Sequence, residues 1–121
     1  MSKKTSFPQQ GQIWLTEFPP AKESRKPIRP VLVISDNIQN EYGQWVVAIP
    51  FTTEDIEQVE LFEVLVPNTK ENGLDKISKL QFNYPFTVDK ERFKQQLGLA
   101  NRKIIEQAKI AWKVAFDSEN W

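Results

Sequence analysis

The run Val-Leu-Val-Ile-Ser at residues 31–35 decides the fold class of this 121-residue chain. Consecutive apolar residues, most of them β-branched, are typical of a short strand that is covered on both faces. A second such run, Trp-Val-Val-Ala-Ile-Pro-Phe-Thr at residues 45–52, follows a polar turn that we expect at residues 36–43. The sequence therefore predicts two buried strands in the first half of the chain.

The flanking sequence predicts further short strands. Residues 13–18 combine β-branched and aromatic side chains and stop at Pro19-Pro20, since proline cannot donate a hydrogen bond to a sheet. Residues 53–59 are acidic and are expected to form a loop. Three more strands are expected at residues 61–66, 78–82 and 94–99, with one helical turn capped by Asp89 before the last of them.

The end of the chain has the pattern of one amphipathic helix. Asn101 is a suitable N-cap, and apolar side chains then recur at helical spacing. The stripe consists of Ile104, Ile105, Ala108, Ala111, Trp112, Ala115 and Phe116. Five or six short strands and one terminal helix predict a mostly β domain in the form of a small, strongly bent barrel. We expect residues 1–10 to form a flexible tail and residues 11–121 to form a single domain.

Composition limits the chemistry that the chain can perform. It contains no cysteine and no histidine, which excludes disulfides, thiolate metal sites, cysteine nucleophiles and histidine acid–base pairs. A formal net charge of zero and a pI of about 6.3 mean that any nucleic acid has to bind a local basic patch. Neither a signal peptide nor a stretch that could span a bilayer is present. We therefore expect a cytoplasmic protein without membrane, metal or cofactor.

Four segments, taken in order, resemble those of the MazF/PemK family of RNA-cutting toxins. Gly-Gln-Ile-Trp at residues 11–14 is similar to the family's Gly-Asp-(Ile/Val)-aromatic opening, and residues 29–35 are similar to its Arg-Pro strand. Residues 47–52 resemble its strand that ends in Pro-(Ile/Leu)-Thr, and Thr-Val-Asp-Lys-Glu-Arg-Phe at residues 87–93 resembles its Thr-(Ile/Val)-Asp-Lys turn. With the terminal helix, the resemblance covers roughly residues 11–116.

The resemblance implies an SH3-like barrel of five to seven strands with a C-terminal amphipathic helix. It also implies the toxin of a type II toxin–antitoxin system, a sequence-specific endoribonuclease that cleaves single-stranded RNA such as mRNA without a metal. The implied partners are this RNA, an acidic antitoxin protein and a second copy of the chain. A homodimer would also cover surplus apolar surface of a barrel this small.

Arg29 and Thr52 are the positions on which the family's catalytic arginine and threonine fall. RNA supplies its own nucleophile, the 2′-hydroxyl, so the enzyme has to orient it and stabilise the phosphorane charge. The planar guanidinium of Arg29 suits the second task, with a surface ion pair as the alternative. Thr52 suits a contact to the phosphate or to the nucleophile. Neither residue is a good base, and Glu23 is the nearest candidate general base, with a solvated surface position as its alternative.

A basic loop precedes the candidate catalytic arginine. Lys22, Arg25 and Lys26 give it a local positive charge that suits the backbone of RNA, or they form an ordinary solvated loop. We also expect the acidic antitoxin to bind over this loop, because opposite charge would steer it there.

An aromatic stretch is the second candidate RNA-binding element. Alternation would place Phe82, Tyr84 and Phe86 on one face of an extended segment, where aromatic rings can stack on unpaired bases. Core packing or a dimer contact is the alternative. Gln81 and Asn83 belong to the same element, at positions where one branch of the family carries an arginine and an aspartate that assist cleavage.

These departures from the family pattern keep two other functions open. Asn83 stands at the position of an acid and Phe86 at that of an arginine, which favours a degenerate relative that binds RNA or protein without cutting. The other alternative is a binding protein like the gyrase-poisoning CcdB family, which shares this fold and acts through its C-terminal end. The terminal Trp121 is a weak indication of that function.

Overall fold

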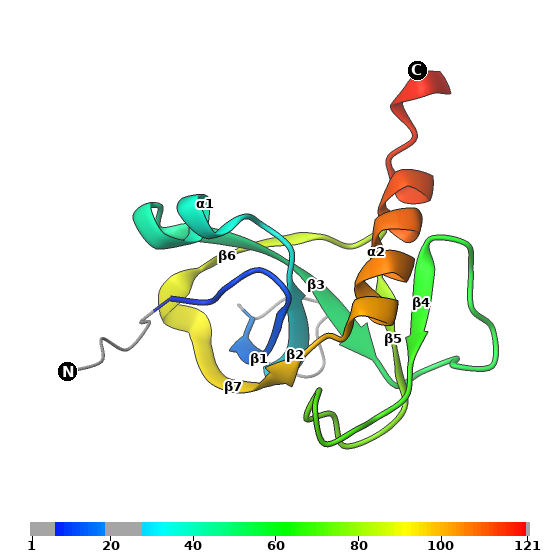
Figure 1. Ribbon diagram of the computed structural model, residues 1–121, viewed down its shortest axis with the longest axis horizontal. Helices are drawn as coiled ribbons and strands as arrows, with labels where there is room; N and C mark the ends of the chain where they lie inside the picture. The colour runs from blue at the N-terminus through cyan, green and yellow to red at the C-terminus, as the bar shows by residue number, and fades with distance from the viewer. Residues whose placement is uncertain (1–6, 19–27, 121) are drawn as a thin grey trace.

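The computed structural model describes residues 7–18 and 28–120 (Figure 1). Its strands are β1 (Gln12–Glu17), β2 (Ile28–Val33), β3 (Trp45–Thr52), β4 (Glu63–Val66), β5 (Ser78–Gln81), β6 (Phe86–Asp89) and β7 (Phe93–Leu99). Its helices are α1 (Asn37–Tyr42) and α2 (Arg102–Ala115), with short 3₁₀ helices η1 (Lys90–Arg92) and η2 (Ser118–Asn120). The prediction of a mostly β fold with a C-terminal helix is confirmed.

Strand β3 is the centre of the sheet and pairs along both of its edges. One edge pairs with β2, whereas the other pairs first with β6 and then, through Phe51 and Thr52, with β5. The order is β4-β5-β3-β2-β1-β7, and all pairs are antiparallel. Two register shifts between β1 and β7 bend that side of the sheet. Within the described residues β4 and β7 do not pair, so the barrel-like sheet stays open (Figure 1).

The two faces of the sheet carry separate apolar cores. Leu32 and Ile49 belong to the core that α2 covers, whereas Val31, Val33 and Val46 belong to the core on the opposite face. Successive residues of a strand point to opposite faces, so the run at residues 31–33 is buried throughout. The prediction of a strand covered on both faces is confirmed.

Helix α2 packs against the sheet through the side chains that its periodicity indicates. Asn101 caps the helix, its side chain accepting a hydrogen bond from the Ile104 N–H at 2.9 Å. Ile104, Ala108 and Ala111 are buried against the sheet. Trp112 lies at the rim of this contact, with its ring edge-on to Phe82 at 6.5 Å between centroids. The predicted terminal helix and its N-cap are therefore confirmed.

The polar turn predicted at residues 36–43 is wrong, because residues 37–42 form helix α1. Asp36 caps it by accepting a hydrogen bond from the Gln39 N–H at 2.9 Å. Asn40 is buried, and its side chain donates to the Ser35 carbonyl at 2.9 Å. A single buried polar residue takes the place of an apolar stripe, so no periodicity signals this helix.

Other boundaries agree with the sequence to within a few residues. β2 begins at Ile28 and so includes Arg29, and β4 begins at Glu63. The helical turn predicted at Asp89 is confirmed by η1, with the Asp89 carboxylate accepting from the Glu91 N–H at 2.9 Å. Of the predicted tail, residues 1–6 lie outside the described residues, and the Gln10 N–H donates to the Asn37 side chain at 2.7 Å. No helix in residues 7–18 and 28–120 is both long and apolar enough to cross a membrane.

Candidate functional site

Arg29 lies in the first half of β2, and two contacts orient its half-buried side chain. Its Nη2 donates to the Phe51 carbonyl at 3.1 Å, and its guanidinium carbon lies 5.6 Å from the centroid of the Phe18 ring. That distance is within the range of a cation–π contact. Burial lowers the pKa of Arg29, and the negative charge of Glu54 opposes this effect. The ordinary pKa of arginine lies far above neutral pH, so the guanidinium stays charged. The contacts with Phe51 and Phe18 hold this charged group in a fixed direction.

Thr52, the last residue of β3, directly follows Phe51, whose carbonyl Arg29 binds. The pairing of β2 with β3 ends with Val31 opposite Pro50, and the same register continued for two residues leads from Arg29 to Thr52. Residues that lie opposite each other in an antiparallel pair share a face of the sheet. The Thr52 hydroxyl accepts a hydrogen bond from the Glu54 N–H at 3.2 Å. The structure thus brings together the two residues that the sequence singled out.

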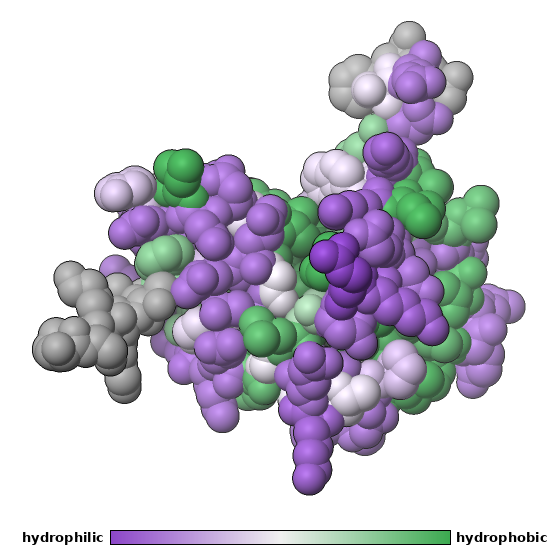
Figure 2. Space-filling model, viewed as in Figure 1, coloured by the Kyte–Doolittle hydropathy of each residue, from purple (hydrophilic) through white to green (hydrophobic). Residues whose placement is uncertain are grey.

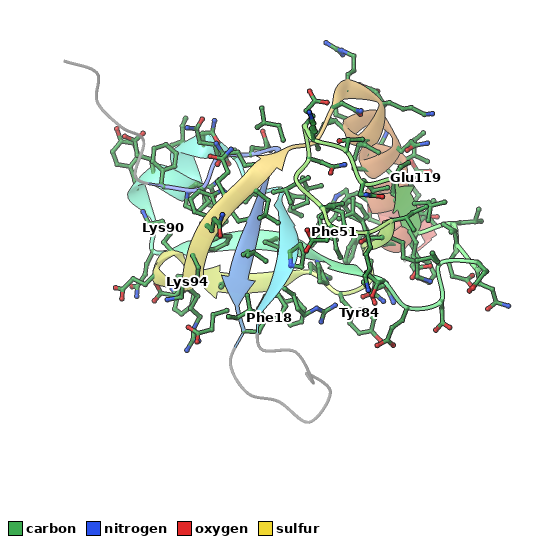
Figure 3. The ribbon with its side chains drawn as sticks, turned by 90° about the horizontal axis from the view of Figure 1, so that it is seen from below. Phe18, Phe51, Tyr84, Lys90, Lys94 and Glu119 are labelled. Carbon is green, nitrogen blue, oxygen red and sulfur yellow. The ribbon has the colours of Figure 1, made fainter. Side chains whose placement is uncertain are left out.

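An aromatic pair extends this site away from the strand ends. The rings of Phe18 and Phe86 lie 4.7 Å apart between centroids, with an angle of 32° between their planes. Phe86 is 37% exposed and Tyr84 is 55% exposed. In Figure 3 Phe18 and Tyr84 lie along the same lower edge of the molecule, with Phe51 above them. Arg29 therefore lies against an aromatic platform of two rings, of which Phe18 is buried and Phe86 is accessible at the surface.

The prediction that Phe82, Tyr84 and Phe86 share one face is wrong. Phe82 is only 1% exposed and belongs to the core beneath α2. β5 ends at Gln81, and the chain then turns, with the Tyr84 N–H donating to the Gln81 carbonyl at 3.0 Å. The turn breaks the alternation that a continuous strand would have kept. Core packing, the alternative raised from the sequence, describes Phe82, while Tyr84 and Phe86 remain accessible.

The family comparison decides what kind of protein carries this geometry. The family model described as the PemK-like, MazF-like toxin of type II toxin–antitoxin systems matches residues 9–116. The chain belongs to this family. The resemblance seen in the sequence is confirmed, and the match includes every strand of the sheet and helix α2.

Solved structures show the same fold at low sequence identity. An endoribonuclease from a mycobacterial species, in complex with its cognate antitoxin, is 19% identical, with a TM-score of 0.75 over 92% of this chain and 96% of that one. The Mycobacterium tuberculosis toxin MazF-mt6 is 21% identical, with a TM-score of 0.74 over 88% and 96%. MazF from Deinococcus radiodurans is 22% identical, with a TM-score of 0.73 over 92% and 97%. Comparison with curated proteins gives no significant match.

Glu54 is a residue of this MazF/PemK-family site that the sequence reasoning missed. Its charge acts on Arg29, and its N–H contacts the Thr52 hydroxyl. Residues 53–59 are acidic and form a loop, as predicted, yet nothing in the sequence singles out one acid among them. The position of Glu54 two residues after Thr52 becomes informative only once the hydrogen bond from its N–H to the Thr52 hydroxyl is known.

The remaining predicted site residues fall into two groups. Gln81 lies at the end of β5, opposite Glu63, and Asn83 is exposed in the turn that follows. Both therefore lie next to the exposed Tyr84, whose N–H donates to the Gln81 carbonyl at 3.0 Å. The other group lies outside the described residues: Lys22, Glu23, Arg25 and Lys26, together with Trp121.

Proposed function

We propose that the chain is a sequence-specific endoribonuclease that cleaves single-stranded RNA without a metal ion. The observation that carries the proposal is that Arg29, near the start of β2, binds the carbonyl of Phe51, the residue directly before Thr52 at the end of β3. Membership of the PemK/MazF toxin family supports it, and so do the structural neighbours that are themselves named endoribonucleases. A cytoplasmic site of action follows, because single-stranded mRNA is found there.

The proposed reaction needs no nucleophile from the protein. The 2′-oxygen of RNA attacks the adjacent phosphorus, the bond to the 5′-oxygen breaks, and a 2′,3′-cyclic phosphate or its 3′-phosphate product remains. Arg29 pairs with the phosphate oxygens as negative charge grows on them, and Thr52 holds the hydroxyl or the phosphate in line. A base has to accept the 2′-proton, and the leaving 5′-oxygen has to receive one.

Glu54 is our candidate for that base among the described residues. It is the carboxylate whose charge acts on Arg29, and its backbone contacts Thr52. Glu23, proposed from the sequence alone, is the competing candidate. Comparing Glu54→Gln with Glu23→Gln in single-turnover cleavage decides between them, because only loss of the true base flattens the dependence of the rate on pH.

The platform beside Arg29 suits unpaired bases. Tyr84 and Phe86 expose aromatic surface, and stacking on such rings contributes about 1–3 kcal/mol per base. The basic residues Lys22, Arg25 and Lys26 would follow the phosphate backbone, with Gln81 and Asn83 contacting RNA beside the aromatic residues. Because the aromatic residues would contact bases and the basic residues would contact phosphates, we expect substitutions of the aromatic residues to change the preferred RNA sequence more than substitutions of the basic residues do.

The primary test is incubation of the purified protein with a mixed RNA pool in EDTA, followed by mapping of new ends. We expect discrete cuts that end in a cyclic or 3′-phosphate and that disappear with Arg29→Ala. Activity that vanishes in EDTA and returns with Mg²⁺ would contradict the metal-free reaction.

A degenerate binding protein is the second candidate function. The observation that favours it is the absence of charge at Asn83 and Phe86, on the edge where the accessible aromatic residues lie. RNA binding without any new ends in the same experiment would support this function. Restoring Asp at position 83 and Arg at position 81 or 86 would then be expected to restore cutting.

We also propose that two copies pair through surface that this chain leaves apolar. Leu61 is 81% exposed and Ile110 on α2 is 65% exposed. They belong to a set of exposed apolar residues from α2, β4 and the loop before it: Val59, Leu61, Leu65, Ile110 and Val114. Figure 2 shows hydrophobic surface gathered beside α2 on the side of β4. Light scattering at micromolar concentration should give about twice 14.1 kDa; a stable monomer would contradict the dimer.

An acidic antitoxin is the expected protein partner. The mycobacterial neighbour was solved with its cognate antitoxin, and family membership places this chain in the same kind of system. We propose docking over residues 21–29, where Lys22, Arg25 and Lys26 would attract acidic side chains. Unchanged binding to a variant with all three replaced by alanine would contradict that location.

A further inference from the structure

A buried ammonium group stands beside the candidate site. Lys79 on β5 is only 5% exposed, which is rare for lysine unless its charge is paired. Its Nζ lies 3.0 Å from the Glu63 carboxylate, and it donates to the carbonyls of Asp55 at 3.0 Å and Gln58 at 2.8 Å. These acceptors match the N–H bonds of one ammonium group, so all of its donors are engaged.

The position of Lys79 in the sheet links it directly to Thr52. The two residues lie opposite each other where β5 pairs with the end of β3, so their side chains share a face of the sheet. The chain leaves β3 at Thr52 and reaches Asp55 only three residues later. Lys79 therefore anchors the loop that follows Thr52, through the carbonyls of Asp55 and Gln58.

The anchored backbone has an uncommon conformation. Asp55 has φ of 53°, in the left-handed region that residues other than glycine seldom adopt. Its carbonyl accepts from the Lys79 ammonium and also from the Gln58 N–H at 3.1 Å. Such a conformation persists when surrounding contacts determine it, and a buried charged donor is a strong contact of this kind.

We propose that Lys79 is a positioning residue for the reaction, acting through the loop that carries Glu54. By fixing the Asp55 and Gln58 carbonyls, it sets the turn in which the Glu54 N–H contacts the Thr52 hydroxyl and the Glu54 charge acts on Arg29. The inference rests on the proposed RNA cleavage. It assigns a catalytic consequence to an ion pair whose two side chains are buried.

The competing explanation is that the Lys79–Glu63 pair only stabilises the fold. A pair of this kind can often be replaced by neutral residues without loss of stability, whereas removing one partner leaves a buried charge unpaired. The two roles therefore separate in a matched set of variants. Glu63→Gln removes the countercharge of Lys79 and should lower stability, so the comparison is made where both variants are fully folded. The new amide oxygen can still accept from the ammonium and from the Glu60 N–H that contacts Glu63 at 3.0 Å, and the ammonium keeps both loop carbonyls as acceptors. Lys79→Met in the Glu63→Gln background removes the donor and leaves no buried charge unpaired.

The test compares single-turnover cleavage of a mapped RNA by Glu63→Gln and by the double variant Lys79→Met/Glu63→Gln. We expect the double variant to lose about 10- to 100-fold in the maximal rate, with half-saturation by RNA changed less than about twofold, because small misplacements of reacting groups cost factors of this size. Glu63→Gln should stay within about threefold of the wild type. Equal maximal rates of two folded variants would overturn the inference.

A second measurement keeps the inference independent of cleavage. In ¹⁵N NMR spectra we expect the Glu54 N–H to exchange faster with water, and to shift, in the double variant relative to Glu63→Gln. If the wild type cuts no RNA, the proposed function fails while an altered Glu54 signal still supports the anchor. An unchanged Glu54 signal overturns the anchor in every case.

The wild type supplies a measurement if the double variant does not fold. A Lys79 ammonium with all of its donors engaged should give a ¹⁵Nζ resonance that exchanges slowly with water, unlike the exposed Lys103. A Lys79 resonance as labile as that of Lys103 would overturn the inference.

Discussion

The face beneath α2 and the strand ends on the opposite face are held together in different ways. On the face beneath α2, apolar side chains such as Ile104 and Leu80 interlock, and a single side chain, Asn101, caps the helix. On the other face, at the ends of β2 and β3, charged side chains bind backbone carbonyls: Arg29 binds Phe51, and Lys79 binds Asp55 and Gln58. Apolar packing is tolerant of position, whereas charged contacts fix direction. The opposite face has an apolar core as well, and we infer that its strand ends chiefly position groups, whereas the packing beneath α2 chiefly supplies stability.

The largest effect should come from breaking the packed face. Ile104→Ala removes a buried side chain from the contact between α2 and the sheet, and such changes lower the free energy of unfolding by about 2–5 kcal/mol. Denaturant unfolding measures the loss, and Lys103→Ala on the exposed side of the same helix should change it by less than about 0.5 kcal/mol. Cleavage per folded molecule should stay near that of the wild type. A cleavage defect in Ile104→Ala that persists where the protein is fully folded would erase the distinction between the faces.

At the end of β3 we expect a smaller effect, which lowers cleavage and leaves stability almost unchanged. Thr52→Val keeps the shape of the side chain and removes the hydroxyl, so cleavage should fall about fivefold, in line with one hydrogen bond of about 1 kcal/mol. The melting temperature should hardly change, because Thr52 lies at a strand end. The neighbouring exposed residue provides the control, since Thr53→Val should leave cleavage unchanged. Equal losses in both variants would show that the loop, and not the Thr52 hydroxyl, is responsible.

The contrast between the faces also explains what the sequence could predict. The stripe in α2 and the apolar runs of β2 and β3 are periodic or continuous, so local pattern is enough to locate them. Helix α1 has no such stripe, because Asn40 fills the buried position through hydrogen bonds to Ser35. Pattern therefore identified most of the elements that pack, but it overlooked strand β6 and helix α1, the latter held by polar contacts.

Local sequence pattern was equally limited in locating the residues of the candidate site. Arg29 and Thr52 were found through family resemblance, and the hydrogen bond from Arg29 to the Phe51 carbonyl places Arg29 beside the end of β3. Glu54 and Lys79 have no local signature, because their roles depend on atoms contributed by other segments. The predicted alternation of Phe82, Tyr84 and Phe86 is wrong because a turn after Gln81 interrupts a pattern that looks continuous in the sequence.

The smallest expected effect concerns pH, at η1 on the outer edge of β6. Hydrogen bonds from the Glu91 N–H and then from the Gln44 side chain lower the pKa of the exposed Asp89 carboxyl. A lowered pKa in the folded state gives stability that is present above the ordinary aspartate pKa of about 4 and is lost as the pH falls below it. Thermal melts from pH 6 to pH 3 should therefore converge for the wild type and Asp89→Asn as the pH falls. A constant difference across that range would contradict this assignment.

The central claim is that Arg29 stabilises the transition state of RNA cleavage, and single-turnover cleavage of a mapped RNA tests it most directly. We expect Arg29→Ala to lose about 10²-fold or more in rate while RNA affinity and melting temperature change little. Arg29→Lys should recover little, since a point charge cannot reproduce the planar fork that now rests on Phe18 and the Phe51 carbonyl. A folded Arg29→Ala protein that cleaves at nearly the wild-type rate would contradict the claim.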